Sequence, residues 1–142
     1  MIETISGIIM AIVIIVLSQT LSKFFTTKFF AATVLVAIAF IYVGFSLKEN
    51  PTSSIILEIG IALVFYSMAI IGYTRNNLLI AYGIILHGLW DIFHHNGLFV
   101  KTDVPGYWPS FCFIVDIIDG IFFIIIFKNQ KNSRSALLIK NQ

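Results

Sequence analysis

The chain has 142 residues, of which 58% are apolar and only 11% are charged, and its mean hydropathy is +0.96. Soluble domains are about 25% charged, so the composition excludes a water-soluble fold and indicates a single membrane domain over residues 1–142. The net charge of +2 excludes nucleic acid as the expected partner, because such binding needs a clustered basic face. The lipid bilayer is the expected partner, and the expected localisation is a cell membrane, most simply a bacterial inner membrane, with several passes.

Apolar segments long enough to cross a bilayer can be followed in chain order. A hydrocarbon core of about 30 Å takes roughly 20 helical residues, with about 17 as the lower limit, and only fully hydrogen-bonded backbone can face lipid. The segments that meet this length, and that polar or proline-containing turns separate, are 5–22, 29–47, 53–73, 78–95 and 111–127. The sequence therefore predicts an all-α, polytopic membrane helix bundle of about five transmembrane helices, followed by a polar tail over 128–142.

Two of these segments are unusual because they carry several ionisable residues. The fourth has four of them in its second half, His87, Asp91, His94 and His95. A loop then follows whose later part, 104–110, has two prolines and two aromatic residues and is predicted to lie at the headgroup level. The fifth segment contains Asp116 and Asp119, and the third contains one acidic residue, Glu58.

The distribution of basic residues predicts an orientation. If five helices alternate, seven of the nine Lys and Arg residues fall on the side of the C-terminus, and Lys48 and Lys101 fall on the other side. By the positive-inside rule, the C-terminus is predicted to be cytoplasmic and the N-terminus outside. Five ionisable residues of the third, fourth and fifth spans then lie roughly 6 to 13 Å from the outer ends of their helices, at 1.5 Å per residue. They are Glu58, His87, Asp91, Asp116 and Asp119.

This common depth predicts one polar site in the outer half of the bundle. Imidazoles and carboxylates that converge from different helices are ligands of Zn, Mn or Fe. The predicted metal ligands are His87, Asp91, His94, His95 and Asp116, and the predicted catalytic acids or bases are Asp116, Asp119 and Glu58. Other roles stay open at this stage: Glu58 could extend toward the surface, and His94 and His95 could be solvated at a helix end.

Two patterns around this site resemble known families. The residues His87 to His95 read H-x-x-W-D-x-x-H-H, and Pro109 to Asp116 read P-x-F-C-x-x-x-D. This pair resembles a family of small uncharacterised bacterial membrane proteins, which implies that these residues form one site and implies no particular reaction. The spacing also loosely resembles the H-x-x-H-H boxes of membrane desaturases, but a di-iron site needs many more histidines than the three present here. A single-metal, hydrolase-like site is favoured instead.

Five glycines inside the predicted spans have a structural interpretation. Gly44, Gly60, Gly72, Gly83 and Gly88 are predicted to be points of close helix packing. The sequence contains no phosphate-binding G-x-x-x-x-G-K-[ST] motif and no dinucleotide fingerprint.

Three functional classes remain open. The first is an enzyme that uses a divalent metal, most simply for hydrolysis of a lipid or another amphipathic substrate. The second is a structural or accessory membrane subunit whose polar cluster locks helix packing. The third is a proton or metal-ion carrier. The lack of ionisable residues in the cytoplasmic half of the spans counts against this class, unless the chain forms a homo-oligomer.

Overall fold

The computed structural model describes residues 2–48, 51–94, 100 and 102–140, and within these it contains five α-helices and no strand. The helices are α1 (Ile2–Leu21), α2 (Thr27–Ser46), α3 (Thr52–Thr74), α4 (Asn77–His94) and α5 (Trp108–Lys140). The predicted all-α fold is confirmed. In the described part of the chain, four helices, α1, α2, α3 and α5, are long and apolar enough to cross a membrane. The protein is therefore a membrane helix bundle.

Helix α4 differs from the other four, and its predicted role as a fifth transmembrane span stays a prediction. It has 18 residues, which corresponds to about 27 Å, and it is not among the helices apolar enough to span by themselves. Three of its residues, His87, Asp91 and His94, lower its hydropathy and are buried. Helices α2, α3 and α5 all pack against it, so its polar groups are enclosed by protein.

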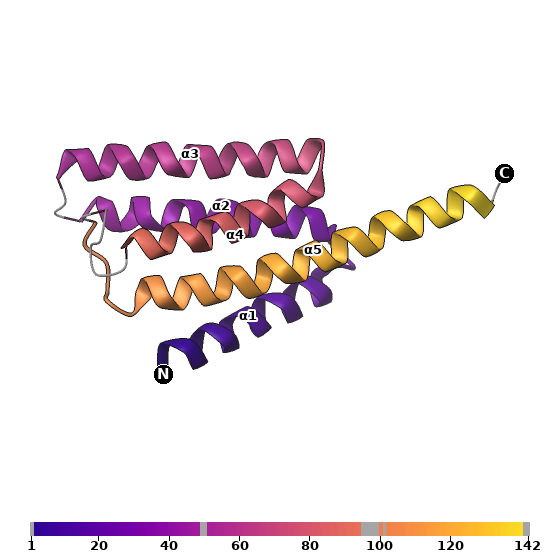
Figure 1. Cartoon of the computed structure of the whole chain (residues 1–142), viewed down its shortest axis with the longest axis horizontal. Helices are drawn as coiled ribbons and strands as arrows, with labels where there is room; N and C mark the ends of the chain where they lie inside the picture. The colour runs from indigo at the N-terminus through magenta and orange to yellow at the C-terminus, as the bar shows by residue number, and fades with distance from the viewer. Residues whose placement is uncertain (1, 49–50, 95–99, 101, 141–142) are drawn as a thin grey trace.

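The five helices lie roughly alongside one another, and the chain reverses direction at each turn (Figure 1). The start of α1, the ends of α2 and α4, and the starts of α3 and α5 share one end of the bundle. The α1–α2 and α3–α4 turns lie at the other end, from which the last part of α5 projects. Helix α4 packs most extensively against α5, α2 packs mainly against α3, and α1 is held mainly by α5.

The start of α5 is earlier than the predicted boundary at residue 111. The Trp108 amide donates a hydrogen bond of 2.8 Å to the carbonyl oxygen of Pro105, and the Phe111 amide donates one of 3.1 Å to that of Tyr107. Pro109 fits the first helical turn because this turn needs no amide donor there and the proline ring fixes a helical φ. Residues 108–110, predicted as part of an interfacial loop, are therefore helical.

The end of α5 is also later than the predicted span. The apolar run ends at Phe127, but the helix continues to Lys140, so most of the predicted polar tail is helical. Hydropathy marks where a helix leaves an apolar environment, whereas the backbone continues as a helix wherever residues of adequate helix propensity follow. Figure 1 shows this segment beyond the bundle.

Close helix packing occurs at some of the predicted glycines and not at others. A Cβ on Gly72 would lie 2.5 Å from Ile80, one on Gly83 would lie 2.6 Å from Leu35, and one on Gly88 would lie 2.9 Å from Asp116 on α5. The prediction is wrong for Gly44 and Gly60, where a Cβ would meet nothing within 4 Å. Both lie on exposed faces, and an apolar helix does not reveal from its sequence which face is exposed to lipid.

Candidate functional site

Ionisable and polar side chains from four helices meet in the half of the bundle that contains the start of α1. Each of the seven is at most 2% exposed. They are Tyr42 on α2, Glu58 on α3, His87, Asp91 and His94 on α4, and Asp116 and Asp119 on α5. Complete burial of this many polar groups requires that each be hydrogen-bonded, neutralised or bound to a ligand.

The first group within this site consists of His87, Asp91 and Asp116. His87 Nδ1 shares a hydrogen bond of 2.7 Å with Asp116 Oδ2, and it lies 4.0 Å from Asp91 Oδ1. One ligand atom from each of the three residues lies within 4.8 Å of the other two. The spacing of four residues places His87 and Asp91 on one face of α4. The absence of a side chain at Gly88 lets Asp116 approach, because a Cβ there would lie 2.9 Å from the Asp116 Cβ.

The second group consists of Glu58, His94 and Thr102. Glu58 Oε1 lies 2.7 Å from His94 Nε2, and it accepts a hydrogen bond of 2.6 Å from the Thr102 hydroxyl. These contacts hold Glu58 inside the bundle, so the alternative that it extends toward the surface is wrong. Likewise, His94 is enclosed rather than solvated, with 2% of its surface exposed.

Tyr42 joins the two groups. Its hydroxyl donates a hydrogen bond of 2.7 Å to Asp91 Oδ1, and its ring stacks on the His94 imidazole with centroids 3.9 Å apart. Tyr42 and Thr102 are not among the site residues predicted from the sequence. Tyr42 lies four residues before the end of α2, about 6 Å along the axis, so a comparison of depths that included tyrosine could have found it. Thr102 lies in a connecting segment, and no sequence signal distinguishes it.

Asp119 is buried but lies outside both groups. It is fully enclosed, and neither of its carboxylate oxygens has a hydrogen-bond partner in the described part of the chain. Asp91 Oδ2 is also buried without a hydrogen-bond partner there. Among the predicted ligands, His95 lies outside the described residues. The structure thus brings together Glu58, His87, Asp91, His94 and Asp116, and it leaves Asp119 one helical turn away along α5.

The buried charges do not balance. Among the described residues, the buried Asp, Glu and His side chains are four carboxylates and two imidazoles, and no Lys or Arg is buried with them. Two imidazolium groups could neutralise at most two of the carboxylates. Because an isolated charge in such an environment costs several kcal/mol, the remaining carboxylates need protons or a shared metal cation.

The first group has suitable chemistry for a metal, although its present geometry is that of a hydrogen-bonded cluster. One imidazole nitrogen and two carboxylates match the ligands of Zn, Mn or Fe, and Asp91 has an unpartnered oxygen. Ligand atoms on one tetrahedral ion lie about 3.3 Å apart, whereas His87 Nδ1 and Asp116 Oδ2 are 2.7 Å apart. A metal could therefore replace the proton between these two atoms if they separated by roughly 0.6 Å.

The chain belongs to the family of unknown function DUF6010, whose model matches residues 2–130. This match covers all of α1 to α4 and the part of α5 that packs in the bundle. No curated protein and no solved structure matches the chain. The family agrees with the resemblance to uncharacterised membrane proteins, and the pair of sequence patterns around the site stays a prediction.

Proposed function

We propose that this member of the DUF6010 family is a metal-dependent, hydrolase-like enzyme that acts on a lipid or another amphipathic substrate within a bacterial cell membrane. The observation that supports the proposal is the buried group of His87, Asp91 and Asp116, whose ligand atoms lie within 4.8 Å of one another. Zn, Mn and Fe are the metals that this donor set suits.

The surrounding residues have distinct roles in this proposal. A bound divalent metal supplies Lewis acidity and makes a water molecule a better nucleophile. His87, Asp91 and Asp116 would hold the metal, and the Tyr42 hydroxyl fixes the orientation of Asp91 through a hydrogen bond of 2.7 Å. Asp119 is the proposed proton acceptor, because both of its buried oxygens lack a hydrogen-bond partner among the described residues.

The pair formed by Glu58 and His94 is a second place where a proton can be held. The distance of 2.7 Å between Glu58 Oε1 and His94 Nε2 allows one proton to be shared directly. The Thr102 hydroxyl donates a hydrogen bond to the same Glu58 oxygen, so this oxygen acts as an acceptor toward both of its neighbours. In the proposed reaction, the pair of Glu58 and His94 holds a proton beside the group of His87, Asp91 and Asp116. Tyr42 connects the two, because its ring stacks on His94 and its hydroxyl donates to Asp91.

Orientation is part of the proposal. Seven of the nine basic residues of the sequence belong to the side that contains the C-terminus, so we place that terminus in the cytoplasm and the polar site in the outer half of the membrane. A topology reporter fused after Gln142 should report the cytoplasm, and one inserted at Asp103 should report the outside. A cytoplasmic signal at Asp103 would contradict both the orientation and substrate entry from the outer leaflet.

A structural lock is the second candidate, and one observation favours it. His87 and Asp116 already share a short hydrogen bond across α4 and α5, and the whole cluster is buried, as expected of groups that fix helix packing. In this case the polar residues specify the assembly of the bundle or of a larger complex, and no substrate reaches them.

Elemental analysis separates these two candidates. The full chain, purified in detergent without chelator, should contain about one equivalent of a transition metal per chain. Asp116→Ala should lose that metal, while Asp119→Ala, a matched change on the same helix outside the three-residue group, should retain it. Absence of a transition metal from the wild type, or equal metal content in all three proteins, would favour the structural lock.

A further inference from the structure

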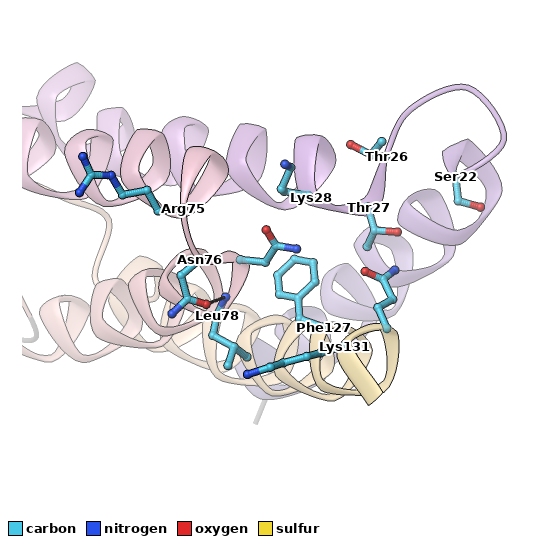
Figure 2. Close-up of a pocket in the computed structure, with 11 residues that line it drawn as sticks. Ser22, Thr26, Thr27, Lys28, Arg75, Asn76, Leu78, Phe127 and Lys131 are labelled. Atoms are coloured by element: carbon cyan, nitrogen blue, oxygen red, sulfur yellow. Dashed lines mark hydrogen bonds between the residues drawn. The ribbon is translucent and has the colours of Figure 1, made fainter. Parts of the chain in front are cut away.

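A second polar region lies at the opposite end of the bundle from the His/Asp site. It is a pocket of about 1150 Å³ (Figure 2). Its walls come from the residue after α1, the start of α2, the α3–α4 turn and the part of α5 that leaves the bundle. The lining residues used below are Lys28, Arg75, Asn77 and Lys131.

The charge of this pocket favours an anion. Lys28, Arg75 and Lys131 line it, and among the residues that the structure describes no Asp or Glu does. In Figure 2, the Phe127 ring lies between Lys28 on α2 and Lys131 on α5. Helices α2 and α4 also begin here, at Thr27 and Asn77, and helix N-termini carry partial positive charge. The side-chain oxygens of Thr26 and Asn76 already accept hydrogen bonds from the amides of Phe29 and Leu78. Basic residues from three elements thus line one volume. The Lys28 ammonium also lies 4.4 Å from the centroid of the Tyr73 ring, a contact that a bound anion would have to share.

A narrower cleft adjoins the pocket and reaches further into the bundle. It has a volume of about 240 Å³ and shares Ser22, Thr27 and Gln130 with the larger pocket. Its inner wall includes Phe122, Ile126 and Ser18. Ser18 is 2% exposed, and its hydroxyl has no hydrogen-bond partner among the described residues. A buried hydroxyl of this kind leaves a donor and an acceptor for a ligand.

We propose that the pocket and cleft together bind an anionic glycerophospholipid. The phosphate would lie among Lys28, Arg75 and Lys131, and the polar glycerol and ester region would reach the Ser18 hydroxyl. An acyl chain would continue along the apolar surfaces of α1 and α5. Free phosphate would satisfy the basic residues but would leave the inner cleft and Ser18 unused. Basic pockets between transmembrane helices are known to bind anionic headgroups, and this site does not depend on the proposed enzymatic function.

The test measures lipid binding to the full chain in nanodiscs or by native mass spectrometry, with phosphatidylglycerol and phosphatidylcholine of identical acyl chains as probes. The double variant Lys28→Gln/Lys131→Gln should bind phosphatidylglycerol about thirtyfold more weakly, from the contribution of two basic residues near a membrane surface. The matched control is Lys23→Gln/Lys128→Gln, which removes the same charge at the same end but from two exposed residues outside the pocket. It should bind nearly as the wild type does.

The inner cleft has its own variants. Ser18→Leu fills it without a change of charge and should weaken phosphatidylglycerol binding at least tenfold, whereas Ser18→Ala removes only the hydroxyl and should weaken it severalfold. Three outcomes would overturn the proposal: equal loss in the two lysine double variants, equal binding of both lipids, or displacement of phosphatidylglycerol by inorganic phosphate with no effect of either Ser18 variant. The last outcome would identify a site for a soluble anion.

Discussion

The hydrogen bond between His87 and Asp116 is the most informative place to perturb the site. Asp116→Asn keeps the volume of the side chain and its capacity to bond to the imidazole, but it removes the negative charge. A cluster that works only as a structural lock should tolerate this change. A metal site should not, because a neutral amide is a much poorer ligand than a carboxylate for these metals.

The size of the effect can be estimated from binding linkage. A metal at about 100 times its Kd stabilises the folded state by roughly 2.7 kcal/mol. If the loss of one of three ligands raises Kd about 100-fold, which is the upper range for outer-shell residues, stabilisation of the variant falls to roughly 0.4 kcal/mol at the same metal concentration. At about 3 °C per kcal/mol for a chain of this length, the wild type should shift by about 8 °C and the Asp116→Asn variant by about 1 °C.

The assay is a thermal unfolding series on detergent-purified protein that has first been stripped with a chelator. Zn²⁺, Mn²⁺ and Fe²⁺ are added separately at equal free concentrations, and the metal-free Tm of the variant should be close to that of the wild type. Asp119→Asn is the control, because it makes the same substitution at a buried site on α5 outside the three-residue group; it should shift as the wild type does. The reasoning fails if no metal shifts the wild type, or if Asp116→Asn shifts equally.

Two further predictions concern packing and the orientation of ligands. Gly88→Ala should lower the free energy of unfolding by about 1 to 3 kcal/mol relative to the control Gly60→Ala. Both variants gain helix propensity, but only Gly88→Ala places a Cβ within 2.9 Å of the Asp116 Cβ. Equal stabilities of the two variants would contradict the close approach of α4 and α5. Tyr42→Phe should destabilise the metal-free protein by about 1.5 to 3 kcal/mol, the value of a hydrogen bond to a charged group, and should weaken metal stabilisation in the same thermal series. An unchanged metal shift in that variant would show that Asp91 needs no orienting donor.

Much of the fold could be predicted because the bilayer limits the choice so strongly. Long apolar runs can only be helices, and their predicted ends differ from the observed ends by a few residues for α1 to α4. The two errors in α5 have local causes. At its start, the Pro105 carbonyl accepts a hydrogen bond from Trp108 and closes a turn that the prolines had suggested was a loop. At its end, residues beyond Phe127 are polar but still helix-compatible, so polarity did not mark the end of the helix.

The positions of the site residues along their helix axes could be predicted from the sequence, but the rotation of each helix about its axis could not. Helical rise placed Glu58, Asp91 and Asp116 at a common level, and the structure brings their helices together there. Rotation about a helix axis is set by packing, which sequence spacing describes only within one helix. Asp119 shows the limit: it is three residues after Asp116, so its side chain points about 60° away and lies about 4.5 Å further along the axis. This difference is enough to leave it outside the metal group.

The remaining alternative is an ion carrier. It would require a path for ions through the layer of side chains between the two ends of the bundle. From the His/Asp site toward the basic pocket, the buried side chains of the described helices are apolar except for the Ser18 hydroxyl beside the pocket, and they include Leu35, Ala62, Ile80, Ile84 and Phe123. All of these except Ala62 are large, and each is fully enclosed. A proton or a metal ion that crossed this layer would pass no acidic, basic or imidazole group that could bind it. A chain of this kind can concentrate charge at one end of the bundle without conducting it to the other end, which supports a function confined to the half that contains the His/Asp site.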